Sequence, residues 1–322
     1  MRLWGIYMFG ALIIAVIIFP VLVLISTKYY SDTKEFEIRF MGKAQTEVLK
    51  GICILVVFFH HFSHMVDVKY LELVYRITPI AVGIFFFLAG YATFLQFERM
   101  EQADYIEFWK KKIFRLYLPI LIFTITYNNF LGGLLWMYFV TWLAYRFFDN
   151  HIRIMIIVIG NIAFILICVL LGLGNWWYVD VLPFCFGVIF ARWENEILHF
   201  FQKKFYWVSG SVLSVILCGF CVLHILQWKQ YTLFAIINVS VFTFLMILIL
   251  MKVDLHSRIF TFLGKYSWEI FFMHQIIIMM VHRVIQNPTV VMIISLGLVI
   301  FMAYWIQKGW NILISRITRG KS

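Results

Sequence analysis

The chain has 322 residues, of which 63% are hydrophobic, 20% are aromatic and only 13% are charged. Soluble domains contain about 45–50% apolar and about 25% charged residues, so this composition excludes an ordinary soluble protein. The net charge of +11 does not indicate nucleic-acid binding, because the lysines and arginines cluster in the short connections between apolar runs, as topology determinants do.

Nearly uncharged windows of about 17 or more residues recur along the chain, and each is long enough to cross the hydrocarbon layer of a bilayer. They predict an all-α, polytopic transmembrane bundle of about 11 helices, with a ten-helix core and one additional N-terminal helix. The first run, residues 3–25, is too long for the apolar part of a signal peptide, so we expect a retained helix. The ten core spans are expected at 51–67, 79–97, 114–131, 133–148, 154–173, 176–191, 206–226, 232–251, 266–282 and 290–310.

The distribution of positive charge predicts the topology. If Lys50 is cytoplasmic and the sides alternate along the chain, 22 of the 27 Lys and Arg residues lie on the inner side. We therefore expect a multi-pass protein of the cytoplasmic membrane with its N-terminus outside and its C-terminus inside. Residues 1–49 are predicted to form the additional helix and a polar cytoplasmic segment, and residues 50–322 the ten-helix domain.

The first candidate site begins at Lys50 and ends at a group of three histidines, His60, His61 and His64. Lys50 and His61 are eleven residues apart, which is about 1,100° of helix rotation and about 16 Å of rise, so they share one face. A neutral imidazole is the usual base for a hydroxyl nucleophile. The alternative is that these histidines bridge neighbouring helices, and for His60 and His64 the residues favour that interpretation.

Three further stretches contain candidate residues. Lys111, Lys112 and Arg115 lie at the head of a predicted helix at the inner surface, where they would bind an anion such as a phosphate or would only fix topology. Ser267, Glu269 and His274 lie on a late span as a second polar wall or as a structural hydrogen-bonding pair between helices. Trp177 and Asp180, at an outer helix end, would bind a sugar or belong to an ordinary aromatic belt.

In this order, these stretches resemble the membrane acyltransferase 3 family, multipass enzymes that move acyl groups, mostly acetyl, from acyl-coenzyme A to carbohydrates. Residues 50–61 match its Arg-x10-His motif with Lys50 in place of Arg, and residues 83–91 its Phe-Phe segment between glycines. Lys112 and Arg115 before Pro119 are similar to its Arg pair, and residues 263–274 to its Gly-x-x-Ser helix with a following His. Lys50 and Lys112 keep the charge of the family's arginines but lose the forked guanidinium.

The resemblance implies an O-acyltransferase that uses cytoplasmic acetyl-CoA and acylates a hydroxyl of a cell-surface or lipid-linked glycan. It implies His61, Lys50 and His274 as catalytic residues, Lys111, Lys112 and Arg115 as coenzyme A ligands, and no metal. Trp177, Asp180 and Glu269 would bind the acceptor. Membrane lipid is an expected partner, nucleic acid is not, and a homodimer is left open. The competing hypothesis is a transporter or flippase of a lipid-linked sugar; transporters often contain internal repeats, and the sequence shows none.

Overall fold

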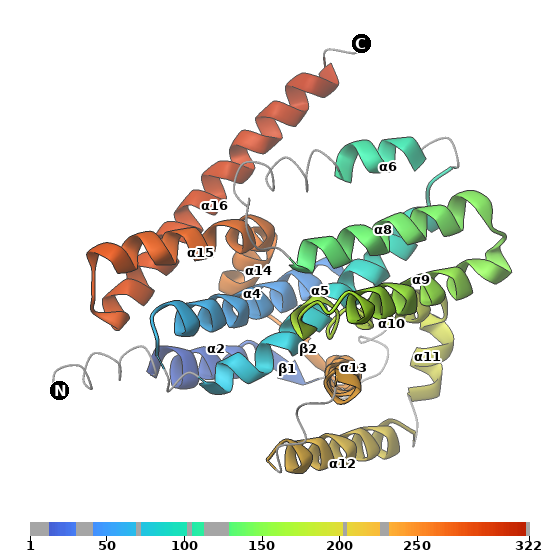
Figure 1. Ribbon diagram of the computed structural model, residues 1–322, viewed down its shortest axis with the longest axis horizontal. Coiled ribbons are helices and arrows are strands. Elements are labelled where there is room, and N and C mark those ends of the chain that lie inside the picture. The colour runs from blue at the N-terminus through green and yellow to red at the C-terminus, as the bar shows by residue number, and fades with distance from the viewer. Residues whose placement is uncertain are drawn as a thin grey trace. The chain divides into compact units, whose positions relative to one another are not determined.

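The computed structural model describes residues 13–29, 41–68, 72–101, 105–112, 129–201, 205–225 and 232–319. Nearly all regular structure in these ranges is helical, which confirms the predicted all-α class (Figure 1). Strands β1 (Thr27–Tyr29) and β2 (Val253–Leu255) form a small two-stranded sheet. Among the described residues, five helical segments are long and apolar enough to cross a bilayer, so the chain is a membrane protein: Lys43–Met65, Ile77–Glu98, Asn150–Leu170, Thr232–Leu250 and Pro288–Trp310.

The chain divides into two compact units, one of residues 1–29, 41–78 and 254–322 and the other of residues 30–40 and 79–253. The helices of the first unit are a π-helical turn η1 (Ile14–Ile18), α2 (Phe19–Ile25), α4 (Lys43–Met65), α14 (Arg258–Lys265), α15 (Ser267–Val284) and α16 (Pro288–Arg319). Helix α5 (Glu72–Glu98) begins in the first unit and continues into the second.

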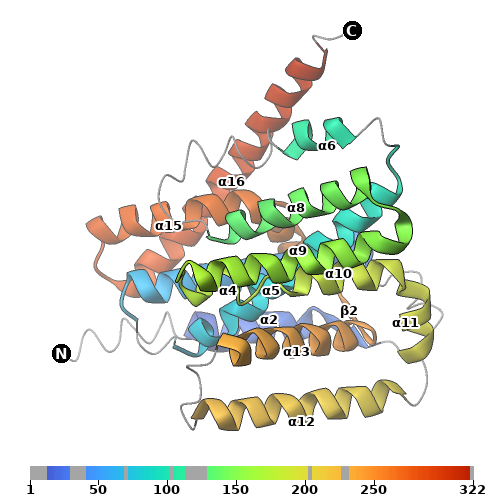
Figure 2. The same cartoon turned by 45° about the vertical axis from the view of Figure 1, so that its right-hand side comes forward.

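The second unit contains most of α5 and the following helices: α6 (Tyr105–Lys112), α8 (Asn129–Phe147), α9 (Asn150–Leu170), the short 3-10 turn η5 (Asn175–Trp177), α10 (Pro183–Arg192), α11 (Glu194–Phe201), α12 (Phe205–Ile225) and α13 (Thr232–Leu250). Helices α8 and α9 lie side by side, as do α12 and α13 (Figure 2). The Nε1–H of Trp136 in α8 donates to the carbonyl oxygen of Gly160 in α9 at 2.8 Å.

Helices α4 and α14 contact each other backbone to backbone in the first unit. A Cβ atom at Gly51 would overlap the carbonyl oxygen of Phe260, and a Cβ atom at Gly264 would overlap the carbonyl oxygen of Glu47. Such an approach requires residues without side chains, as it does at many helix contacts in membranes. The two glycines therefore determine how closely α14 lies on α4.

In the second unit, α5 and α10 also contact each other backbone to backbone. A Cβ atom at Gly90 would overlap the carbonyl oxygen of Phe184, and one at Gly187 would overlap the carbonyl oxygen of Phe87. Gly90 is the second glycine of the Phe-Phe segment noted in the sequence. Its contact with Phe184 is a physical reason for a glycine at this position.

Helices α15 and α16 form a hairpin within the first unit. Val284 ends α15, and the side-chain oxygen of Asn287 accepts hydrogen bonds from the backbone N–H groups of Thr289 (3.0 Å) and Val290 (3.3 Å). Asparagine at an N-cap followed by proline at the first helical position is a strong signal for a helix start. Helix α16 therefore begins at Pro288, where the chain reverses direction after α15.

Two predicted boundaries were wrong. Helix α4 begins at Lys43 rather than at residue 51, with Gly42 as its N-cap, because the helix continues beyond the apolar window into residues that include Lys43, Glu47 and Lys50. The span expected at 176–191 is not one helix, since η5 ends at Trp177 and α10 begins at Pro183. Ten helical residues rise only about 15 Å, about half of the hydrocarbon thickness.

The other expected core spans, apart from 114–131, coincide with described helices to within several residues. The span 114–131 lies largely outside the described residues. The division at residues 49 and 50, the cytoplasmic membrane and the orientation of the termini stay predictions.

Candidate active site

Helix α4 carries His60 and His61 close to its C-terminal end. Both imidazoles are half-buried, while Phe58, Phe59 and Phe62 beside them are at most 2% exposed. The aromatic side chains pack into the core of the first unit and hold this part of the helix in place. The two histidines therefore lie at the edge of an apolar core, where polar groups need partners.

Those partners come from α15. The ring centroids of His61 and His274 are 4.9 Å apart, and those of His60 and His61 are 4.8 Å apart. The amide nitrogen of Gln275 lies 3.2 Å from Nδ1 and 3.3 Å from Nε2 of His61. We call His60, His61, His274 and Gln275 the histidine cluster. It joins two of the three residues that the sequence predicted as catalytic.

The geometry around His274 determines which of its nitrogens carries the hydrogen. Nδ1 lies 3.1 Å from the carbonyl oxygen of Ile270, and because a carbonyl only accepts, Nδ1 must be the donor. In a neutral imidazole Nε2 then holds the lone pair. The side chain is 1% exposed, and Nε2 has no hydrogen-bond partner within the described part of the chain. The lone pair on Nε2 is therefore able to accept a hydrogen bond from a hydroxyl or an N–H group.

Lys50 lies on α4 but not in the histidine cluster. The helix is continuous from Lys43 to Met65, so the predicted separation of about 16 Å from His61 holds. Its half-buried side chain lies one turn after Glu47. Any role of Lys50 in catalysis therefore concerns a part of the substrate distant from the imidazoles.

Ser267 and Glu269 lie in the first turn of α15. Ser267 is 9% exposed and is seven residues before His274, so the two share a face about 10 Å apart along the helix. Glu269 is half-buried and points to another side of the helix. Ser267 and His274 thus share the face of α15 on which the sequence predicts a polar wall.

The basic residues predicted to bind coenzyme A belong to the second unit. Lys112 ends α6, and its Nζ lies 3.9 Å from the ring centroid of Tyr138 in α8 and 5.3 Å from that of Phe108. These are cation–π contacts, which stabilise the ammonium group over the aromatic faces. Lys111 lies in the same helix, but its side chain is outside the description, as is Arg115 entirely.

Trp177 and Asp180 lie close together after α9 in the second unit. Trp177 ends η5, and a Cβ atom at Gly132 of α8 would lie 3.1 Å from its ring. Asp180 is half-buried in the connection to α10, and burial raises the pKa of its carboxyl to about 7. A carboxyl that is partly protonated near neutral pH is able both to donate and to accept hydrogen bonds.

Gln275 is the site residue that the sequence reasoning missed. It directly follows His274 in an otherwise apolar run, and a second polar residue within such a run was a usable signal. In the described part of the chain, no group of three or more His, Cys, Asp and Glu side chains is placed to hold a metal ion.

The comparison with protein families agrees with the motifs. The family model described as "Acyltransferase domain" matches residues 44–132 and 129–308, which include every predicted site residue. No curated protein and no solved structure matches the chain. The match covers well over half of the sequence and extends over both units. The chain is therefore a membrane-embedded acyltransferase and belongs to the acyltransferase 3 family.

Proposed function

We propose that this protein transfers an acetyl group from acetyl-CoA to a hydroxyl group of a cell-surface or lipid-linked glycan. The observation that carries the proposal is the buried lone pair on Nε2 of His274, next to the imidazole of His61. Acylation of a hydroxyl requires a base that takes its proton, and a neutral imidazole does this at working pH. Family membership supports acyl transfer, and the histidine cluster supports a hydroxyl as the acceptor.

We assign the step to the two imidazoles as follows. The acceptor oxygen attacks the thioester carbonyl carbon while Nε2 of His274 takes the hydroxyl proton, which forms a C–O bond. The C–S bond then breaks, and the coenzyme A thiolate receives that proton and leaves as a thiol. His61 is half-buried, whereas His274 is 1% exposed, so His61 is the relay that links the base to its surroundings. The amide of Gln275 orients the relay.

The donor site is assigned to the basic run. Coenzyme A carries several phosphate charges, and arginine and lysine are the side chains that bind such a polyanion. Lys111, Lys112 and Arg115 lie within five residues of one another in sequence, next to the end of α6. Lys50 is assigned to a part of the donor distant from the thioester, because it lies about 16 Å from His61 along the same helix.

The acceptor site is assigned to Trp177, Asp180 and Glu269. An indole face stacks on the apolar face of a sugar ring, and a carboxyl group binds sugar hydroxyls. The raised pKa of Asp180, which burial causes, supports a carboxyl that donates as well as accepts. Glu269 would bind a second part of the acceptor.

Radiolabelled acetyl-CoA tests the proposal in membranes that contain the protein. We expect covalent label in the glycan with the wild-type chain and none with His274→Ala at an equal protein level. An unmodified glycan that crosses the membrane, without incorporated label, would show a transporter or flippase instead.

A further inference from the structure

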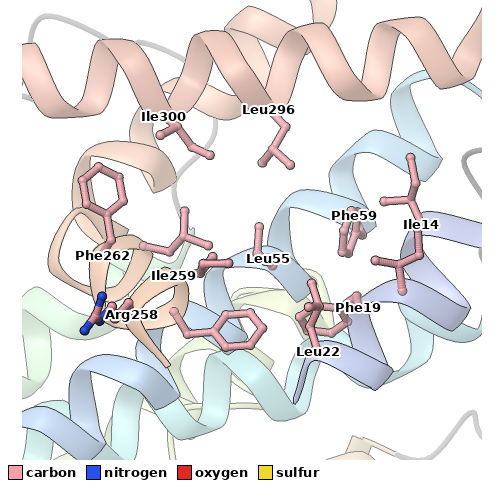
Figure 3. Close-up of a pocket in the computed structure, with 13 residues that line it drawn as sticks. Ile14, Phe19, Leu22, Leu55, Phe59, Arg258, Ile259, Phe262, Leu296 and Ile300 are labelled. Carbon is pink, nitrogen blue, oxygen red and sulfur yellow. The ribbon is translucent and has the colours of Figure 1, made fainter. Parts of the chain in front are cut away.

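A cavity of about 450 Å³ lies within the first unit, apart from the histidine cluster. Its lining comes from η1, α2, α4, α14 and α16 (Figure 3). Leu55 and Phe59 line it from α4, and Leu296 and Ile300 line it from α16. Cavities of this size accept small ligands or part of a larger one.

The lining is apolar except at one position. Arg258 is the single charged residue among the described residues that line the cavity, and it lies at one edge of the group in Figure 3. It is the first residue of α14, after the N-cap Ser257, and its side chain is exposed. Its guanidinium nitrogens point away from the other labelled side chains in Figure 3, so the carbon part of Arg258 lines the cavity and its charge lies outside.

The cavity is separate from the proposed chemistry. Leu55 and Phe59 precede His61 by six and two residues, which corresponds to about 240° and about 200° of rotation around α4. The cavity and the histidine cluster therefore lie on nearly opposite faces of that helix. A ligand in the cavity would not reach the imidazoles.

We propose that this cavity binds one acyl chain of an anionic membrane phospholipid, with the lipid phosphate on Arg258. Water gains no hydrogen bonds in an apolar cavity, whereas each buried methylene of an acyl chain contributes about 0.8 kcal/mol. The forked guanidinium matches the geometry of a phosphate. A membrane protein meets phospholipid at high concentration, so both parts of this ligand are always present.

The N-terminal helix closes one side of this lipid site. The ring of Phe19 in α2 lies edge-on to Phe59 (5.6 Å between centroids) and to Phe260 (6.1 Å). The helix that precedes the family match therefore contributes one wall of the site, and this inference does not depend on acyl transfer.

Native mass spectrometry of the full chain in detergent tests the proposal, with phosphatidylglycerol and phosphatidylcholine of identical acyl chains as probes. Leu296→Trp fills the cavity, and we expect it to weaken phosphatidylglycerol binding about tenfold, since a loss of two methylene contacts is sufficient for this. Leu298→Trp is the matched control, because Leu298 is on the same helix, is 42% exposed and does not line the cavity. Ile300→Phe fills the same space with less bulk and serves as the second variant.

The headgroup is tested separately. Arg258→Gln should reduce the preference for phosphatidylglycerol over phosphatidylcholine about fivefold, which corresponds to about 1 kcal/mol for a basic side chain near anionic lipid. Arg283→Gln, at an exposed position outside the cavity, should leave the preference unchanged. Because phosphatidylcholine carries the same phosphate, the deciding result is the binding of phosphatidylglycerol itself, and an affinity of Arg258→Gln equal to that of the wild type would overturn the role of Arg258. Unchanged phosphatidylglycerol binding by the folded cavity-filling variants would overturn the site itself.

Discussion

The imidazole of His274 donates its Nδ1 hydrogen to the backbone carbonyl oxygen of Ile270, one helical turn earlier, at 3.1 Å. This bond holds the ring at a fixed angle and leaves the lone pair on Nε2. Nε2 has no hydrogen-bond partner among the described residues, and the proposed role of His274 as the base requires such an uncommitted acceptor.

The first prediction separates the chemistry of His274 from its structural bond. His274→Asn keeps an amide N–H where Nδ1 lies and removes the base, and His274→Ala removes both. We expect both variants to lose transferase activity by about 10²–10⁴-fold, the usual contribution of a general base. The measurement is label transfer from acetyl-CoA in membranes, and His151→Ala on an exposed part of α9 is the control. Near-normal activity of His274→Asn would refute the base assignment.

A second prediction concerns Gln275, whose amide nitrogen lies 3.2 Å from Nδ1 of His61. Gln275→Met keeps the size of the side chain and removes the amide. Because the relay then loses its orientation but the substrate sites remain, kcat should fall about tenfold with little change in KM, as for other positioning residues. Gln286→Met provides the comparison, because Gln286 is exposed and its amide donates to the carbonyl oxygen of His282 in the preceding turn. An equal rise in KM with constant kcat would place Gln275 in substrate binding instead.

A third prediction tests the contact between α4 and α14. Gly51→Ala places a methyl group against the carbonyl of Phe260, and the helices must separate to accommodate it. We expect a loss of about 1–3 kcal/mol in the free energy of unfolding, typical of overpacking. Thermal unfolding in detergent measures it, with Gly297→Ala as the control, because no atom lies within 4 Å of a Cβ there. Equal unfolding temperatures for the two variants would contradict the close approach.

The fourth prediction is a pH dependence at Asp180. Its pKa is about 7 in the folded protein, while an unfolded aspartate has a pKa of about 3.9. The folded state therefore favours the protonated form, and the associated stability is complete below about pH 4 and lost as the pH rises to about 7. Asp180→Asn removes this dependence. The gain in unfolding temperature of the variant over the wild type should be larger at pH 8 than at pH 5, and a difference independent of pH would contradict it.

The fifth prediction concerns the coenzyme A site. Arg115→Gln and Lys112→Gln should each weaken binding of coenzyme A to the purified protein about tenfold, because each removes one charge-assisted contact to phosphate. Calorimetry measures the affinity. Lys308→Gln removes a lysine that contacts Trp305 in α16, and affinity should stay unchanged in this control. Unchanged affinity in the first two variants would assign the basic run to topology alone.

The helical class and most core spans were predictable, because long uncharged apolar windows specify membrane helices almost independently of tertiary context. The break in the 176–191 span was not predictable, because a hydropathy window does not detect the turn between Trp177 and Pro183. The early start of α4 was not predicted, because residues 43–50 contain two lysines and a glutamate and so lie outside the apolar window that defined the span.

The candidate site was predictable only in part. The spacing of Lys50 and His61 on one face follows from helix geometry, and the structure keeps it. The packing of α15 on α4 brings His274, rather than another polar residue, next to His61. No single stretch of sequence specifies that packing. Gln275 was missed for the same reason, since its role comes from the neighbouring helix.

Gly51 and His61 are ten residues apart on α4, or about 1,000° of rotation, so their Cα–Cβ directions differ by about 80°. The backbone of α4 touches that of α14 at Gly51, where there is no side chain to hold the helices apart. If α4 rotated about its long axis, a residue with a side chain would replace Gly51 and collide with α14. A turn by one residue, about 100°, would carry the His61 imidazole away from α15. The glycine contact thus fixes the direction in which His61 points around the helix axis, and in the proposed mechanism an alanine at Gly51 lowers transferase activity as well as stability.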